Sequence, residues 1–155
     1  MNQQQHLSRR NFIAAAGLGA AAAGMGTNTA RAAINELEAA NEKVVLDMCV
    51  AIESVDPAKI EPFLGDKLVF QLIDGQPLVK GKEAFMKASA QFFAAYEKAE
   101  FIMHRSHVMG NLVINERTDN FTAKEGGTDQ SFHVTGFFVV KEGKIQEWRD
   151  YMVPQ

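Results

Sequence analysis

The sequence predicts an α+β domain in which one curved, mixed or antiparallel sheet packs against helices. Apolar residues between positions 34 and 95 recur mainly at the three- and four-residue spacing of amphipathic helices. After Glu100 the pattern changes to the alternation typical of β-strands and keeps it almost to the end of the sequence. A sheet with one apolar face must bury that face, and the preceding helices are available to cover it. Helices inside a strongly curved sheet leave a cone with an internal pocket, which is a natural ligand site.

The first 32 residues are predicted to be an export signal, and residues 33–155 to be the domain. Residues 1–32 contain no Asp or Glu. Arg9-Arg10 is followed by a weakly apolar Ala/Gly run and then by the small-x-small cleavage site Ala30-Arg31-Ala32, in the order of a signal peptide. Residues 8–13 resemble a twin-arginine signal, although Ala14 stands where that signal usually has Lys. The resemblance implies delivery by the twin-arginine export machinery to the periplasm or the medium; the alternative is an unstructured tail with a chance Arg pair.

Two main helices are predicted in the first half of the domain. Apolar residues at helical spacing predict the first over residues 34–54, which ends at Asp56-Pro57. A short helical turn is predicted at residues 60–63, and a second long helix at residues 82–95. The inner face of the second helix is predicted to carry Phe85, Ala88, Phe92 and Phe93.

Strands are predicted between the two helices and throughout the second half of the domain. Residues 68–73 and 77–79 are the first pair, joined by a hairpin turn at Asp74-Gly75. Four longer strands are then predicted, each separated from the next by a turn that contains Gly. They span residues 101–109, 111–122, 131–141 and 144–153.

The charge balance excludes several classes of partner. Three of the 16 basic side chains and none of the 19 acidic ones precede the predicted cut after Ala32, so the mature chain has 13 bases, 19 acids and a net charge of −6. An acidic domain of this kind is not expected to bind nucleic acid or anionic membranes.

Two residue types that often mark catalytic or metal sites are not expected to do so here. Cys49 is the only cysteine, so it forms no intrachain disulfide, and its helical position favours a place in the core over a role as nucleophile. His104 and His107 are three apart on a predicted strand and are expected on opposite faces, which is a poor arrangement for one metal ion. No metal or cofactor is expected.

Charged residues occur on predicted inward faces of two strands. In strand 111–122, one face carries Val113, Asn115, Arg117, Asp119 and Phe121, and the opposite face carries residues more compatible with solvent. In strand 144–153, Asp150 shares its face with Trp148 and Met152, which are large and apolar and belong inside. The predicted pocket therefore holds Asp119, Arg117 and Asp150 among apolar side chains.

This combination of charges suits acid–base chemistry. A lone buried carboxylate is very unfavourable, but two carboxylates that share one guanidinium leave a single net negative charge. Such a pair tends to divide its protonation, so that one carboxyl group keeps a proton while the other is ionised. An acid and a base are then available in one pocket, and the planar fork of Arg117 can donate to both.

Two stretches carry a resemblance to a known family. "NERTD" at residues 115–119 and "GKIQEWRDYM" at residues 143–152 resemble strands of the limonene-1,2-epoxide hydrolase family, which has the SnoaL-like and nuclear transport factor 2-like fold. The resemblance covers residues 34–153. It implies that Asp119 is the general acid, that Asp150 is the base for an attacking water and that Arg117 bridges them. It also implies a one-step reaction on a small apolar epoxide without metal or cofactor, and a homodimer.

The sequence departs from that family where the water is held. The family has a Tyr and an Asn two residues apart on the first strand, whereas this chain has Phe70 and Leu72 there. Gln71 is predicted to point the other way, and Asn115 is the candidate to replace the missing polar groups. The predicted substrate-binding residues are Trp148, Phe121, Phe70, Leu72, Asn115 and Met152.

Two other functions stay open at this point. An isomerase or cyclase on the same fold could use both carboxylates without an ordered water. A binding or dimerisation domain would need no chemistry, and Arg117-Asp119 would then be a structural ion pair.

Overall fold

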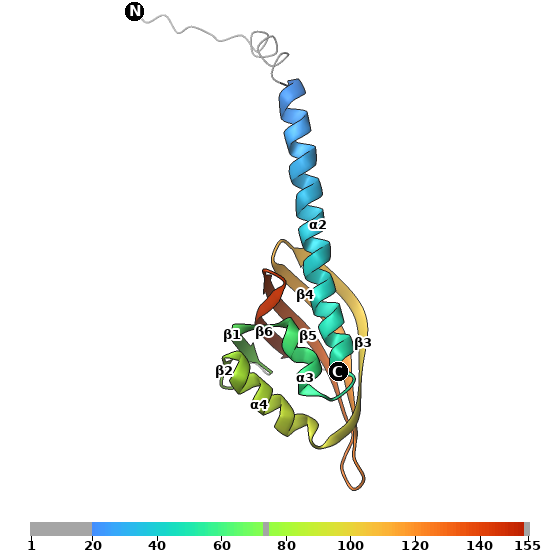
Figure 1. Cartoon of the computed structure of the whole chain (residues 1–155). Helices are drawn as coiled ribbons and strands as arrows, with labels where there is room; N and C mark the ends of the chain where they lie inside the picture. Colours follow the sequence, from blue (N-terminus) through green and yellow to red (C-terminus); the bar gives the residue numbers. More distant parts are fainter. Residues whose placement is uncertain (1–19, 73–74, 154–155) are drawn as a thin grey trace, which may run out of the picture. The chain divides into compact units, whose positions relative to one another are not determined.

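The computed structural model describes residues 20–72 and 75–153, with side chains described from residue 31. The chain divides into two compact units, Met1–Glu36 and Leu37–Gln155. The described part of the first unit is helical and belongs to α2 (Ala20–Ile52), which continues into the second unit (Figure 1). Arg9-Arg10 lies outside the described residues and Ala30-Arg31-Ala32 is helical in the uncleaved chain, so the export signal stays a prediction. Among the residues described, no helix combines the length and apolar character needed to cross a membrane.

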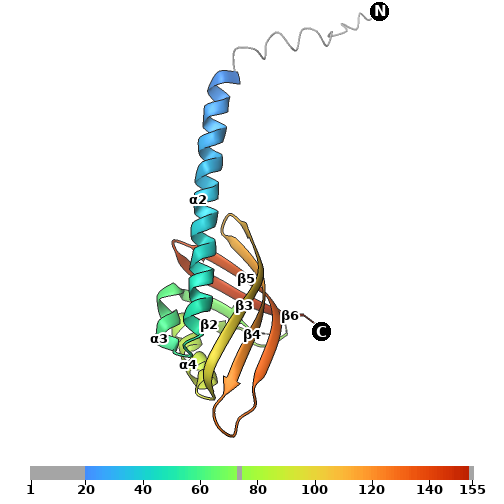
Figure 2. The ribbon, with the colours of Figure 1, turned by 90° about the vertical axis from the view of Figure 1, so that its right-hand side faces the viewer.

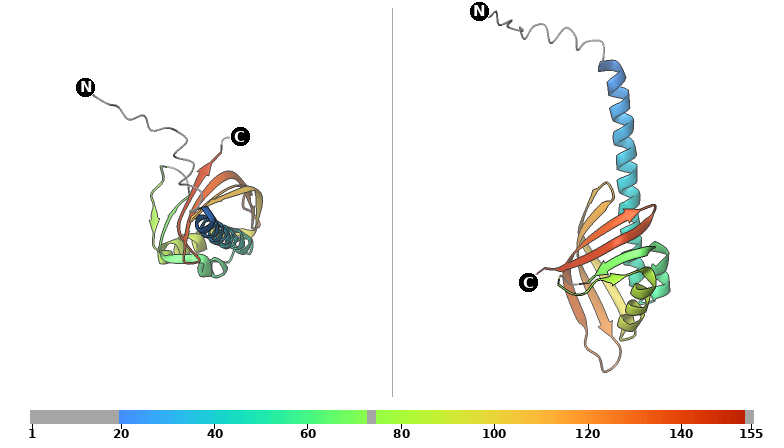
Figure 3. Two further views of the ribbon diagram at one scale, coloured as in Figure 1. Left: turned by 90° about the horizontal axis from the view of Figure 1, so that it is seen from above. Right: turned by 90° about the vertical axis from the view of Figure 1, so that its left-hand side faces the viewer.

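The second unit is built on a six-stranded mixed sheet, which confirms the predicted α+β fold. The strand order is β2-β1-β6-β5-β4-β3, with β1 and β6 parallel and the other neighbours antiparallel. Figures 2 and 3 show the long strands bending together, so that one face of the sheet is concave. The strands are β1 (Leu64–Gln71), β2 (Val79–Lys80), β3 (Tyr96–Met109), β4 (Leu112–Ala123), β5 (Gln130–Lys141) and β6 (Lys144–Met152).

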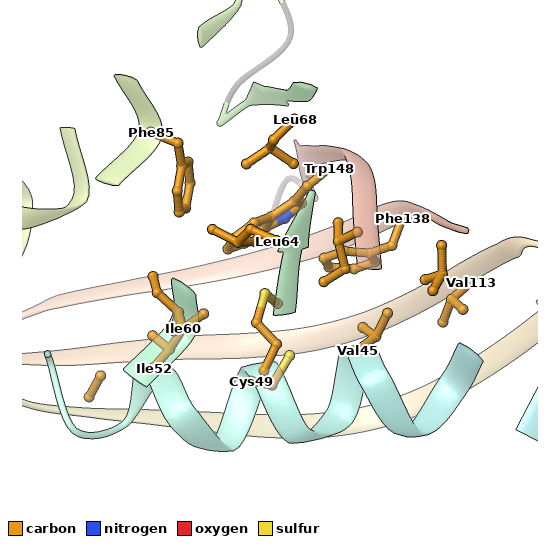
Figure 4. Close-up of a cluster of buried hydrophobic side chains, with 14 of the residues drawn as sticks. Val45, Cys49, Ile52, Ile60, Leu64, Leu68, Phe85, Val113, Phe138 and Trp148 are labelled. Atoms are coloured by element: carbon orange, nitrogen blue, oxygen red, sulfur yellow. The ribbon is translucent and has the colours of Figure 1, made fainter. Parts of the chain in front are cut away.

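The part of α2 in this unit packs on the sheet through one face. Val45, Met48, Cys49 and Ile52 are 0–4% exposed and recur at the spacing of an amphipathic helix. Figure 4 shows Val45, Cys49 and Ile52 on the side of α2 that faces the rest of the core, which includes side chains from the strands. Cys49 is therefore a core residue, as predicted.

Three shorter helical segments complete the unit: α3 (Pro57–Ile60), η1 (Glu61–Phe63) and α4 (Lys82–Phe93). Asp56 caps α3 by accepting a hydrogen bond from the Ala58 backbone N–H at 3.0 Å, with Pro57 in the first turn. On α4, Phe85, Ser89 and Phe93 are buried, which confirms two of the four residues predicted for the inner face. The other two, Ala88 and Phe92, are half-buried, and Ser89 was not predicted there.

Several predicted boundaries were wrong, and irregular strands explain the largest errors. β3 begins at Tyr96 rather than 101, and a register shift between Tyr96 and Lys98 breaks the alternation that would have revealed its start. β1 begins at Leu64 rather than 68 and contains a shift between Leu64 and Val69. Helix α2 begins before the predicted residue 34. Of the predicted hairpin turn, Asp74 lies outside the described residues and Gly75 has a φ of 81°.

The buried face of α2 gives a direct test of the packing. Met48→Ala removes a side chain with no exposed surface, so we expect it to lower the free energy of unfolding by about 2–4 kcal/mol. Val50 is 66% exposed on the same helix, so Val50→Ala is the matched control and should change stability by less than about 0.5 kcal/mol. Urea unfolding of both variants measures this difference. Equal midpoints for the two variants would mean that the face is assigned wrongly.

Candidate active site

Arg117 lies at the centre of a buried hydrogen-bond network on the concave face. Its side chain is fully buried. Nε donates to Asp119 Oδ1 at 2.8 Å and Nη2 donates to Asp150 Oδ2 at 2.7 Å. Nη1 donates to Asn115 Oδ1 at 2.9 Å. All three guanidinium nitrogens are thus engaged, and the two carboxylates are held by one cation.

Strand geometry explains why these side chains meet. Asn115, Arg117 and Asp119 alternate along β4 and so point to one face, where all three are buried. Across β5, Gly136 pairs with Asn115 on one side and with Asp150 on the other. The register of the two neighbouring strands therefore brings Asp150 to the level of the guanidinium.

Gly136 makes room for the guanidinium. A Cβ at this position would overlap Arg117 Nη1 and lie 2.7 Å from both Asn115 Oδ1 and Phe138 Cε2. Any side chain here would displace the cation that joins the two carboxylates. Gly136 was not predicted as part of the site, because a Gly inside a strand also marks bulges and bends.

Aromatic rings surround the cation. The rings of Phe101, Phe138 and Trp148 lie 5.3, 5.7 and 6.0 Å from Arg117 Cζ, within the range of cation–π attraction. Trp148 also donates from Nε1 to Asp150 Oδ1 at 2.9 Å. Asp150 therefore accepts hydrogen bonds on both oxygens, which fixes the orientation of its carboxylate.

The site shifts the pKa values of two of its members. Burial raises the pKa of Asp119 to about 6; the Arg117 guanidinium opposes this rise, and the Asp150 carboxylate adds to it. Burial by itself would lower the pKa of Arg117, but the charges of Asp150 and Asp119 outweigh that effect and raise it. Arg117 stays a cation, while Asp119 exchanges its proton within the physiological pH range.

Asp119 and Asp150 face a mostly apolar cavity of about 170 Å³ between the sheet and the helices. Of the predicted substrate-binding residues, five line this cavity: Trp148, Phe121, Phe70, Leu72 and Met152. The cavity wall also contains residues that the sequence analysis had not assigned to the site. These are Ile52, Phe85, Ala88, Ser89, Phe92, Phe93, Phe101, Phe132 and Val134.

Arg117 and Asn115 lie behind the cavity wall rather than in it. Neither is among the lining residues, and Asn115 is 1% exposed with its carbonyl oxygen bound to Arg117. Within the described residues, Asn115 Nδ2 has no hydrogen-bond partner, and the same holds for Oγ of Ser106, its partner across β3 and β4. The structure therefore places Asn115 as a support for Arg117, away from the surface where a water would meet Asp150. Gln71 is also turned away and donates to the Gln76 carbonyl at 2.9 Å.

The remaining candidates lie outside this network. Burial raises the pKa of Cys49 to about 12, so its thiol is not a nucleophile. The prediction that His104 and His107 face opposite ways was wrong, because the register shifts between Met103 and Arg105. His104 contacts Thr118 and His107 pairs with Ile114, so both lie on the outer face. The described residues contain no group of three or more His, Cys, Asp or Glu that could hold a metal ion.

The architecture is that of SnoaL-like and cystatin-fold proteins. A SnoaL-like protein from Jannaschia sp. CCS1 is 15% identical, with a TM-score of 0.65 over 75% of this chain and 87% of that chain. An uncharacterised cystatin-fold protein from Novosphingobium aromaticivorans is 17% identical, with a TM-score of 0.63 over 71% and 96%. At these identities the likeness concerns the fold alone.

Within this fold class, the chain belongs to the limonene-1,2-epoxide hydrolase family. The model of the limonene-1,2-epoxide hydrolase catalytic domain matches residues 39–154. An LEH-like epoxide hydrolase from M. tuberculosis is 27% identical, with a TM-score of 0.66 over 75% of this chain and 84% of that chain. Family and fold together support a small-molecule hydrolase or isomerase.

The close approach at Gly136 gives a test of the network. We expect Gly136→Ala to push Arg117 away from Asn115 and to weaken its hold on both carboxylates, because the added Cβ overlaps Nη1. The variant should lose about 1–3 kcal/mol of stability by overpacking. Gly143→Ala is the control for Gly→Ala outside the site: its Cβ meets no atom within 4 Å, although its φ of +69° adds backbone strain. Ligand binding in the cavity, measured by calorimetry, should weaken only in Gly136→Ala; unchanged binding there would contradict the role given to Gly136.

Proposed function

We propose that the protein adds water to a small apolar epoxide by one-step general acid–base catalysis. One observation supports this proposal most: a single buried guanidinium holds two carboxylates, at 2.8 and 2.7 Å, in the wall of one apolar cavity. Family membership and the LEH-like epoxide hydrolase from M. tuberculosis point to the same reaction.

Asp119 is the proton donor in this mechanism. Its raised pKa of about 6 means that it holds a proton at mildly acidic pH while Arg117 stays charged beside it. A carboxylic acid in an apolar site can protonate the epoxide oxygen as the ring opens. The ring oxygen thereby becomes a hydroxyl group and stays bonded to the other carbon of the opened ring.

Asp150 is the base that activates water. Its carboxylate is oriented by Trp148 Nε1 and Arg117 Nη2, and each oxygen keeps a lone pair for a further hydrogen bond. The water oxygen forms a bond to one epoxide carbon while the bond from that carbon to the ring oxygen breaks. One water proton passes to Asp150, and the Asp119 proton passes to the ring oxygen. The product is a diol, and proton exchange with solvent returns both carboxyl groups to their starting states.

The lining defines the class of substrate. Half of the 16 described lining residues are Phe or Trp, and besides the carboxyl groups of Asp119 and Asp150 these residues provide one side-chain oxygen, the hydroxyl of Ser89. The volume of about 170 Å³ corresponds to roughly six water molecules. A compact cyclic hydrocarbon epoxide fits this wall better than a charged or strongly polar one.

An isomerase or cyclase is the second candidate, and one observation favours it. The positions where the family has its water-holding Tyr and Asn carry Phe70 and Leu72, and both line the cavity. A proton donor and a base in a cavity with few water-binding groups could move a proton between two atoms of the substrate. Asp119 and Asp150 would then keep their roles without an added water.

Two further proposals rest on the sequence alone. We infer that the precursor is exported through its twin-arginine signal, and that the mature domain is a homodimer. N-terminal sequencing of the exported protein would overturn the first inference if residues 1–32 remain attached. A monomer mass in sedimentation equilibrium would overturn the second.

The reaction is tested with isotopically labelled water. Purified protein and a panel of cyclic hydrocarbon epoxides should give diols that carry one labelled oxygen. Asp119→Asn and Asp150→Asn should each lower kcat/KM at least 100-fold, because each removes one proton-transfer partner. Glu147→Gln is the matched control, since Glu147 lies on β6 outside the cavity wall. Product without label but with exchanged carbon-bound hydrogen would identify the isomerase, and binding without turnover would identify a binding domain.

The pKa of Asp119 predicts the pH dependence of that activity. A general acid must be protonated to act, so kcat/KM should be highest below about pH 6 and fall about tenfold per pH unit above it. Rates are measured from pH 5 to 9 after subtraction of uncatalysed hydrolysis. The decline should be absent from any residual activity of Asp119→Asn. A flat profile for the unmodified protein is incompatible with Asp119 as the acid.

A further inference from the structure

Ser89 places a neutral hydroxyl group in the wall of the cavity. It lies on α4 among Phe85, Ala88 and Phe93, which also line the cavity, and it is only 8% exposed. Among the lining residues that the structure describes, only Asp119, Asp150 and Ser89 carry oxygen in their side chains. The hydrogen bonds found among the described residues do not use the Ser89 hydroxyl, so it is available to a molecule in the cavity.

Contacts of the neighbouring helical turns locate Ser89 opposite the carboxylates. One turn before it, the Phe85 ring lies 5.6 Å from the ring of Trp148, which donates to Asp150. One turn after it, the Phe92 ring lies 5.0 Å from that of Phe121, which is two residues beyond Asp119 on the same face of β4. Residues three or four apart on a helix share a face, so Ser89 stands between these two contacts. Its side chain therefore faces the part of the sheet that carries both acids.

The attacking water needs a second hydrogen-bond partner besides its base. A water molecule that donates one hydrogen to Asp150 still has another hydrogen, and it attacks well only if its lone pair points at the epoxide carbon. A second acceptor fixes that direction. Phe70 and Leu72 cannot serve, Gln71 is turned to Gln76, and Asn115 lies behind Arg117.

We propose that the Ser89 hydroxyl is the neutral hydrogen-bonding group of this cavity, and that it orients the attacking water against Asp150. In the hydrolysis proposed above, on which this role rests, the water donates one hydrogen to Asp150 and the other to Ser89 Oγ. Ser89 neither gains nor loses a proton, so it is a positioning residue. With any other ligand in the cavity, the same hydroxyl donates a hydrogen bond to a neutral oxygen of the ligand or accepts one from a neutral hydroxyl group of the ligand.

Kinetics of three variants test the role in the reaction. Ser89→Ala and Ser89→Cys should lower kcat for labelled diol formation about 10- to 100-fold with little change in KM, because a misdirected water reacts more slowly in an otherwise intact site. Ser89→Thr keeps the hydroxyl and should restore kcat to within about threefold. The decline of activity above pH 6 should stay in place in all three, since Asp119 is untouched. An unchanged kcat in Ser89→Ala overturns the proposed role.

Binding at pH 8 tests the hydroxyl without relying on turnover. Camphor only accepts hydrogen bonds, and at this pH Asp119, with a pKa of about 6, is ionised and cannot donate one. Trp148 Nε1 already donates to Asp150, so among the described lining residues the Ser89 hydroxyl is then the available donor. Ser89→Ala should weaken camphor binding about fivefold, as for the loss of one hydrogen bond, and leave the affinity for bornane, the hydrocarbon of the same skeleton, unchanged.

The two measurements separate failure of this inference from failure of the proposed function. If no epoxide is hydrolysed but camphor binding depends on Ser89, the hydrolase proposal fails and the polar role of Ser89 stands. If epoxides are hydrolysed and neither kcat nor camphor binding changes in Ser89→Ala, the hydrolase stands and the inference about Ser89 is wrong. Equal weakening of camphor and bornane would show a packing effect and would also overturn it.

Discussion

The burial of one guanidinium between two carboxylates is the constraint on which the rest of this structure depends. A fully buried Arg117 is tolerated because each of its three guanidinium nitrogens donates a hydrogen bond and two carboxyl groups compensate its charge. The surrounding features follow from that requirement. Gly136 leaves space for the guanidinium, and Asn115 accepts a hydrogen bond from its third nitrogen. Aromatic rings lie near its faces. Loss of either carboxylate would leave a buried charge without its partner, which is why the network behaves as a unit.

Asp119 and Asp150 differ in the number of hydrogen bonds that hold their carboxyl groups. Asp150 has both oxygens held by donors, from Trp148 and Arg117, whereas Asp119 receives one donor from Arg117. Burial favours the protonated form of Asp119 and the nearby Asp150 carboxylate adds to this effect, which together raise the pKa of Asp119 against the opposing charge of Arg117. A site built this way places two carboxyl groups with different hydrogen-bond partners beside one cation, and these two groups are the proton donor and acceptor of the proposed reaction. The chemistry then depends on what the cavity wall holds in front of the two acids, and in this chain that wall is almost wholly apolar.

Much of the fold was predictable, because regular period-two alternation marks a strand directly. The regular stretch of β4 was placed almost to the residue, and its inward face was assigned correctly. The starts of β1 and β3 were misplaced where register shifts interrupt the alternation, and the same kind of shift put His104 and His107 on one face. A bulge depends on how two strands pair, so a pattern read along a single strand does not reveal it.

Residue spacing alone was enough to predict that Asp119, Arg117 and Asp150 point inward among apolar residues, because successive side chains of a regular strand point to opposite faces. It did not determine which inward residues reach the cavity. Arg117 and Asn115 share a face with Asp119, yet of these three only Asp119 borders the cavity, and the guanidinium of Arg117 instead closely approaches Gly136 on the neighbouring strand. The positions of Gly136 and Ser89 in the site were decided by the register across three strands and by the packing of α4. Strand register and helix packing both depend on contacts between residues far apart in the sequence, so the spacing of residues along one element does not predict them.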